Sequence, residues 1–205
     1  MTQMPQAAFQ AAAQAAQFDS TAEQALTTIS HQLTLEINRR GIIAQFEGYF
    51  NLPTLDFQAY RQKYGDIARM DRILKAESKT PDAYQVAKQA DALMAFYNFD
   101  VTTVQKIIEK MGYQLPKEYL THNIQYYLAR TTHGSTLSRI VYAVLNQLDD
   151  NDDDAWKLFS EALASDYYDI QGGTTAEGIH LGVMCATFFK RQLRPHNLTQ
   201  RLSKR

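Results

Sequence analysis

Residues 100–112 read DVTTVQKIIEKMG, and this stretch predicts an amphipathic helix. Asp100 can accept hydrogen bonds from the first free N–H groups, and Gly112 can adopt the left-handed conformation that ends many helices. Between them, apolar side chains recur at spacings of three and four, at Val101, Val104, Ile107, Ile108 and Met111. A chain built from such segments folds by packing helix faces together.

A second helix is predicted to begin at Pro81. Thr80 can cap its N–H groups, proline at the first helical position loses no hydrogen bond, and Asp82 adds a negative charge to the first turn. We expect this helix to run to about Asn98.

The rest of the chain repeats the helical spacing. Ile29, Leu33 and Ile37 share one helical face, and Gly41 then breaks the period before an ordered connection over residues 42–50. Strand-like alternation is nearly absent, and short connections imply antiparallel helical hairpins. We therefore predict an all-α fold, with further helices opened by Pro116 and lying at Leu137–Leu148 and Ala155–Ala164.

Composition and charge exclude several classes of protein. The 205 residues are 45% hydrophobic and carry a formal net charge of −1, so electrostatic binding to nucleic acid or to an anionic membrane surface is not expected. Cys185 is the single cysteine, which rules out an internal disulfide. No stretch is long and apolar enough for a membrane helix, and Met1–Phe18 lacks the pattern of a signal peptide. We expect a cytoplasmic protein.

Two loops are rich in glycine, serine and threonine. Arg130–Ser138 brings hydroxyl groups and Gly134 to the start of a predicted helix, where the positive end of the helix dipole favours phosphate or another anion. Plain helix capping is the other interpretation. In Asp169–His180, Thr174 and Glu177 have the spacing of a capping box, which explains Glu177 unless His180 and the glycines face a pocket.

Other polar clusters have ordinary interpretations from the residues alone. Lys88 and Asp91 lie three apart inside the helix predicted from Pro81, which favours a solvated surface pair. The acidic run Asp149–Asp154 has partial calcium-loop spacing, but Ala155 replaces the glycine that such a loop needs, so a helix-starting acidic loop is preferred. His133 and His180 lack the neighbouring ligands of a metal site.

Four motifs in order resemble glycoside hydrolase family 65, the family of the maltose, trehalose, kojibiose and nigerose phosphorylases. The resemblance covers about residues 25–187, and its motifs are Gly41–Tyr49, Lys88–Asp91, Arg130–Ser138 and Gln171–Gly182. The resemblance implies an (α/α)6 barrel, of which these residues supply about the second half. Residues 1–24 then form a Gln/Ala-rich terminal helix or frayed segment, and residues 188–205 form a divergent basic tail.

The resemblance also assigns roles to residues. Lys88 and Gln89 are expected to contact the glucosyl unit, which reverses the interpretation as a surface pair. His133, Ser135 and Ser138 are expected to bind inorganic phosphate, with Thr136 keeping a hydroxyl where the family more often has serine. The general acid of the family is a glutamate in an Asp-Glu-Tyr motif, which does not occur in this sequence. No catalytic residue and no metal ligand are therefore assigned.

The implied activity is inverting phosphorolysis of an α-linked glucosyl disaccharide such as maltose, trehalose or trehalose 6-phosphate, releasing β-glucose 1-phosphate. Phosphate is already a nucleophile, so a phosphorylase needs an acid but no base to activate water. No cofactor beyond phosphate as co-substrate is expected, and the partners expected are a missing N-terminal half or a second copy of the chain. The alternative is a non-catalytic sugar- or phosphate-binding helical protein, or the remnant of a split gene.

Overall fold

The computed structural model describes residues 20–165 and 167–168. These residues form helices, and the only bridges among them outside helical structure are the isolated pairs Ile37–Ile43 and Ala87–Thr131, which confirms the predicted all-α class. None of the described helices combines the length and the apolar character needed to cross a membrane. The loop at Asp169–His180, Cys185 and the basic tail lie outside the described residues, and the predicted domain boundaries stay predictions.

The chain divides into two compact units, which we describe separately. The first unit comprises Met1–Tyr49 and Asp91–Asn123, and the second comprises Phe50–Ala90 and Ile124–Arg205. Helix α7 (Tyr119–Leu128) contributes its first residues to the former and its last residues to the latter. The other helices of the first unit are α2 (Ser20–Gln32), η3 (Asp91–Leu93), α5 (Met94–Asn98) and α6 (Val101–Lys110), where η marks a 3-10 helix.

Helix α6 forms as its local sequence predicts. The Asp100 carboxylate accepts a hydrogen bond from the Thr103 N–H at 3.0 Å, and Gly112 follows the helix with a φ of 92°. The apolar face is buried at Val104, Ile107 and Ile108. Capping and apolar spacing agree here. The local sequence therefore determines the ends and the apolar face of α6, and tertiary packing buries that face.

Helix α2 is shorter than the apolar spacing predicted. It ends at Gln32, so Leu33 and Ile37 do not lie on it. The backbone instead bonds to its own unit: the Leu35 N–H donates to the Tyr113 hydroxyl at 2.8 Å, and Ile37 pairs with Ile43. These partners replace the hydrogen bonds that a longer helix would have made.

The connection after Gly41 is ordered, as predicted, and Asn123 holds it. The Asn123 side chain has no exposed surface and donates to the Gly41 and Tyr119 carbonyl groups, each at 2.7 Å. Its side-chain oxygen accepts from the Ile43 N–H at 2.9 Å. One buried amide therefore bonds to three backbone groups and ties the connection to the start of α7.

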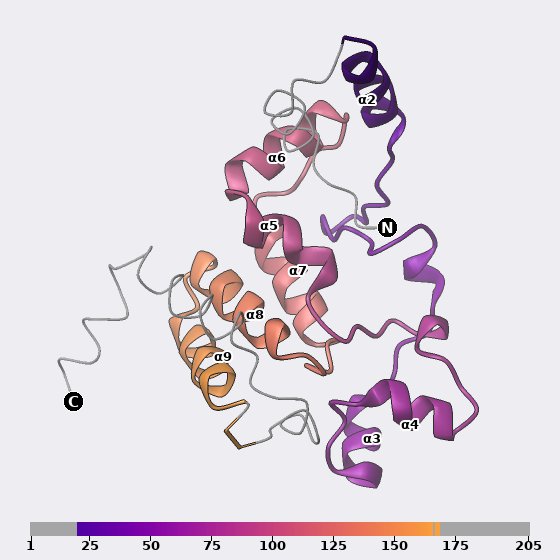
Figure 1. The fold of residues 1–205 in the computed structure, drawn as a ribbon, viewed down its shortest axis with the longest axis vertical. Coiled ribbons are helices and arrows are strands. Elements are labelled where there is room, and N and C mark those ends of the chain that lie inside the picture. The colour runs from indigo at the N-terminus through magenta and orange to yellow at the C-terminus, as the bar shows by residue number, and fades with distance from the viewer. Residues whose placement is uncertain (1–19, 166, 169–205) are drawn as a thin grey trace, which may run out of the picture. The chain divides into compact units, whose positions relative to one another are not determined.

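The second unit carries two packed groups of helices. Its elements are η1 (Tyr49–Asn51, which begins on the last residue of the first unit), α3 (Phe57–Tyr64), α4 (Met70–Ala76), η2 (Pro81–Ala83), α8 (Thr136–Leu148) and α9 (Asp152–Ala164). Helices α3 and α4 share a core around Met70 and Leu74. Helices α8 and α9 pack side by side as the predicted hairpin (Figure 1).

The acidic run forms the start of α9, which was the preferred interpretation. The Asn151 side chain accepts from the Asp154 N–H at 3.5 Å. Asp152, Asp153 and Asp154 occupy the first turn, where the helix dipole stabilises negative charge.

The helix predicted from Pro81 to about Asn98 is wrong beyond its first turn. Thr80 does cap, since its hydroxyl accepts from the Asp82 N–H at 3.4 Å, but η2 ends at Ala83. Residues 84–90 are not helical, and helical structure returns only at η3 and α5. The cause is a backbone pairing with a distant loop, because the Ala87 N–H donates to the Arg130 carbonyl at 2.9 Å. An amide so engaged cannot bond within a helix.

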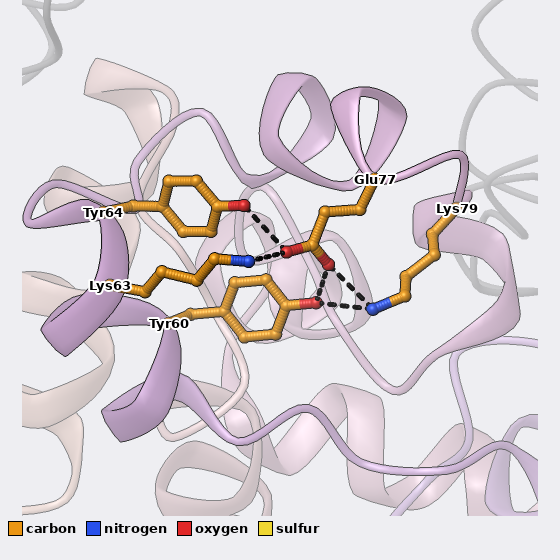
Figure 2. A network of polar contacts seen from close by, with 5 residues as sticks. All are labelled: Tyr60, Lys63, Tyr64, Glu77 and Lys79. Carbon is orange, nitrogen blue, oxygen red and sulfur yellow. Dashed lines mark hydrogen bonds and ion pairs between the residues drawn. The ribbon is translucent and has the colours of Figure 1, made fainter.

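Glu77 ties α3 to the segment that follows α4, as Figure 2 shows. Its carboxylate accepts from the ammonium groups of Lys63 and Lys79, each at 2.7 Å. The hydroxyls of Tyr64 and Tyr60 donate to it at 2.7 and 2.8 Å. The hydrogen bonds from Lys63 and then Lys79 hold the pKa of the Glu77 carboxyl far below its usual range.

We expect Glu77→Gln to lower the melting temperature at neutral pH, with a difference that shrinks in 1 M salt. A carboxyl whose folded-state pKa is depressed stabilises the fold above its ordinary pKa, and that contribution is lost as the pH falls toward the folded-state value. The difference between the wild type and the variant should therefore be smaller at pH 3 than at pH 7. Thermal melts at pH 3 and 7, in low and high salt, measure this effect. A difference in melting temperature between the two proteins that changes with neither salt nor pH would contradict the prediction.

Candidate functional site

Two segments far apart in the sequence lie against each other in the second unit. Ala87 and Thr131 form a parallel bridge, and the Thr132 N–H donates to the Ala87 carbonyl at 2.9 Å. One step further along, the Gly134 N–H donates to the Lys88 carbonyl at 3.1 Å. The predicted sugar-binding segment is thus held by backbone hydrogen bonds against the loop at Arg130–Ser138.

Gly134 lies where no side chain fits. A Cβ atom added there would lie 2.4 Å from the Ala68 carbonyl oxygen and 3.2 Å from Cγ of Lys88. The first contact is with backbone, which cannot rotate away as a flexible side chain does. The glycine therefore permits the close approach of three chain segments.

Two side-chain contacts hold the ring of His133. Its backbone has a φ of 54°, an uncommon conformation for a residue with a side chain. Its Nδ1 lies 3.0 Å from the Ser138 hydroxyl, and its ring meets Tyr142 edge to face at 5.5 Å between centroids. With Nδ1 engaged, Nε2 is the ring nitrogen left for a ligand.

The His133 imidazole is neutral at neutral pH. Burial lowers the pKa of His133 to about 4, and the positive charges of Arg139 and Arg61 act in the same direction. A neutral imidazole has one donor and one acceptor nitrogen. The Ser138 hydroxyl can donate to Nδ1 or accept from it, so Nε2 can be either the donor or the acceptor toward a ligand.

Ser135 and Ser138 differ in their surroundings. Ser135 is half-buried at the N-cap of α8, yet its side chain makes no capping hydrogen bond. Ser138 has no exposed surface, and in this arrangement its hydroxyl orients His133. Thr136 is buried at the first position of α8. The phosphate-binding roles of His133, Ser135 and Ser138 stay predictions.

Lys88 and Gln89 lie outside any helix, so the surface pair of Lys88 and Asp91 on one helical face is wrong. Lys88 is exposed and Gln89 is half-buried. Arg69 chiefly lowers the pKa of the Asp71 carboxyl, and the charge of Lys88 adds a smaller effect in the same direction. Their sugar-binding roles stay predictions.

Sequence reasoning missed two buried polar residues that support the loop. The side-chain oxygen of Gln85 accepts from the Tyr126 hydroxyl at 2.6 Å and from Arg130 Nε at 3.1 Å, fixing the start of the loop. Arg139 is 7% exposed and donates to the His133 carbonyl at 3.1 Å. The available clue was a charged residue within the apolar run of α8.

The assembled groups suit an anion better than a metal ion. A neutral imidazole, a serine hydroxyl and a helix N-terminus offer hydrogen bonds to phosphate oxygens, while an exposed lysine adds positive charge beside them. Among the described residues, no group of three or more His, Cys, Asp or Glu side chains is placed to hold a metal ion.

Comparison with known proteins identifies the family. The family model of the glycosyl hydrolase family 65 central catalytic domain matches residues 2–189. The chain belongs to glycoside hydrolase family 65. The resemblance seen in the four sequence motifs is thereby confirmed, and the all-α structure agrees with the (α/α)6 barrel of this family.

Curated relatives of this family 65 chain include phosphorylases. A trehalose 6-phosphate phosphorylase of Lactococcus lactis is 52% identical over 159 residues, covering 78% of this chain and 21% of the relative. An uncharacterized glycosyl hydrolase of Mycobacterium tuberculosis is 42% identical over 170 residues, covering 79% and 13%. A kojibiose phosphorylase of Halothermothrix orenii is 26% identical over 125 residues, covering 61% and 14%. The chain spans about a fifth of the Lactococcus enzyme and less of the others.

Proposed function

We propose that this chain supplies the glucosyl-binding and phosphate-binding parts of an inverting α-glucoside phosphorylase. The substrates are an α-linked glucosyl disaccharide and inorganic phosphate, and the products are β-glucose 1-phosphate and the released sugar. The names of the phosphorylase relatives support this reaction class. The trehalose 6-phosphate phosphorylase, 52% identical, makes trehalose 6-phosphate the first disaccharide to test.

The observation that carries the proposal is the uncapped start of α8. A serine at an N-cap ordinarily accepts a hydrogen bond from the helix, but the Ser135 side chain does not. This weighs against plain capping as the reason for the hydroxyl. A phosphate oxygen at that position would receive hydrogen bonds from the helix N-terminus, Ser135 and His133 together.

The reaction needs two contributions from the protein: a loop that positions phosphate and a general acid that protonates the leaving oxygen. A phosphate oxygen attacks C1 of the glucosyl unit from the side opposite the leaving oxygen, and the C1–O bond breaks. The acid donates a proton to the leaving oxygen, and the proton that phosphate loses restores the acid. The loop contributes positioning of the nucleophile. Because Asp-Glu-Tyr is absent from these 205 residues, we place the general acid outside them.

Phosphate binding by the purified chain tests the site directly. We expect Ser135→Ala to weaken inorganic phosphate roughly tenfold in calorimetry without lowering the melting temperature, because the hydroxyl does no capping. Asp100→Ala is the matched control, since this N-cap does bond its helix at Thr103. It should lower the melting temperature and leave phosphate affinity unchanged. If the folded chain shows no binding of phosphate at 10 mM, the proposal is overturned.

Release of glucose 1-phosphate tests the reaction. The chain should be assayed with phosphate and trehalose 6-phosphate, trehalose, maltose or kojibiose, alone and mixed with the part of the Lactococcus relative that lies outside the matched region. Activity only in the mixture supports the division proposed here. Activity of the chain alone would mean that a residue within it serves as the acid. Phosphate binding without activity in either case would favour the non-catalytic binding protein.

A further inference from the structure

Arg139 is a buried charged residue in α8. It lies in the first turns of α8 between Ser138 and Ile140, neither of which is more than 1% exposed. Only 7% of Arg139 itself is exposed. Burying a guanidinium costs desolvation energy, and buried ion pairs are often no more stabilising than apolar side chains of similar volume. Stability alone is therefore a weak explanation for this residue.

The contacts of Arg139 point toward the loop. Its Nη1 donates to the carbonyl oxygen of His133 at 3.1 Å. Its Nε faces the Glu161 carboxylate on α9 at 3.3 Å, and that carboxylate is 38% exposed. The guanidinium thus pairs with Glu161 on α9 through Nε. Its Nη1 bonds to the backbone of His133, which we expect to bind phosphate.

The bonded carbonyl belongs to a backbone that needs support. His133 has a φ of 54°, a conformation that a residue with a side chain adopts only when its surroundings favour it. The imidazole leaves this backbone and reaches Ser138 and Tyr142. Rotation of the His133 carbonyl away from Arg139 would turn the ring out of both contacts.

We propose that Arg139 is a positioning residue of the phosphate loop, anchored by Glu161, which fixes the His133 backbone so that the imidazole presents Nε2 to phosphate. This inference rests on the proposed function for its ligand. It assigns Arg139 no contact with the reacting atoms. Its effect reaches phosphate through the orientation of His133.

The test compares Arg139→Met and Arg139→Lys with Arg72→Met, a control at an exposed arginine on α4. Two quantities are measured: the affinity for inorganic phosphate by calorimetry, and the tautomer and pKa of His133 by nitrogen-detected NMR. We expect Arg139→Met to weaken phosphate binding about tenfold, to raise the His133 pKa and to shift the tautomer equilibrium of its ring. The control should change none of these.

Arg139→Lys separates charge from geometry. A lysine keeps a positive charge near His133, but its compact ammonium cannot span Glu161 and the His133 carbonyl as the planar guanidinium does. We expect the His133 pKa to stay low while the phosphate affinity falls roughly threefold to tenfold. This variant also serves if Arg139→Met does not fold. Wild-type values for both quantities in either folded variant would overturn the positioning role.

Failure of the proposed function would look different. If the wild-type chain binds no phosphate, yet Arg139→Met still shifts the tautomer equilibrium of His133, Arg139 positions the loop and the proposed ligand is wrong. If phosphate binds the wild type and Arg139→Met equally well, phosphate is supported as the ligand and the positioning role of Arg139 is wrong. Glu161→Gln should change phosphate affinity and the His133 ring in the same direction as Arg139→Met but by less. It removes the negative charge that pairs with Arg139 and leaves the guanidinium in the protein.

Discussion

Gly134→Ala is expected to weaken phosphate binding roughly 100-fold and to lower the melting temperature. The added methyl group would lie 2.4 Å from the Ala68 carbonyl oxygen, so the backbone of the loop must move. The hydrogen bond from the Gly134 N–H to Lys88 would then break, separating the two predicted binding segments. Phosphate titration by calorimetry and a thermal melt measure both effects.

Gly65→Ala is the matched control for this substitution. Gly65 ends α3 with a φ of 72°, but no atom lies within 4 Å of an added Cβ. The change strains the backbone by about 1 kcal/mol without a steric clash. It should therefore lower stability and leave phosphate affinity intact. A Gly134→Ala chain that binds phosphate like the wild type would show that the close approach is unimportant for the site.

The second large effect is on the pH dependence of stability at His133. Its pKa falls from 6.5 in the unfolded chain to about 4 in the fold, chiefly because of burial and then because of Arg139 and Arg61. Between these values the unfolded chain binds the proton and the folded chain does not. Acid therefore favours unfolding, and the native state loses about 3 kcal/mol as the pH falls from 6.5 to 4.

His133→Gln should remove this loss. Urea unfolding of the wild type and the variant at several pH values between 4 and 7.5 would show it: the difference between their free energies of unfolding should grow steadily as the pH rises from 4 to 6.5. Above 6.5 the difference should be constant. Parallel curves over the whole range would mean that His133 titrates normally in the fold.

Helices could be predicted from the sequence where the capping residues and the apolar spacing indicate the same bounds. Helix α6 has an acidic cap, an apolar face at helical spacing and a closing glycine, and it forms as predicted. Helices α8 and α9 follow their apolar spacing in the same way. Each of these signals acts within one or two turns of chain, so no distant partner was needed to interpret them.

Local signals failed where a distant backbone competes. Thr80 and Pro81 start a helix correctly, but the Ala87 N–H bonds to the Arg130 carbonyl and ends the helical path. Leu33 has the apolar spacing of α2, yet the chain leaves the helix at Gln32 and the Leu35 N–H finds the Tyr113 hydroxyl. Nothing in the spacing of a single segment reveals a partner at such a distance in the sequence.

The sequence by itself determined the helical class, the caps and the family, because these depend on residue types at fixed short spacings. It also identified Lys88, Gln89, His133, Ser135 and Ser138 as candidates through the family motifs. Only the tertiary structure decided that the Lys88 segment lies against Gly134, that Ser138 bonds to the His133 ring, and that Arg139 reaches the His133 backbone from α8. These contacts depend on hydrogen bonds and close approaches between segments that meet only after the helices have packed.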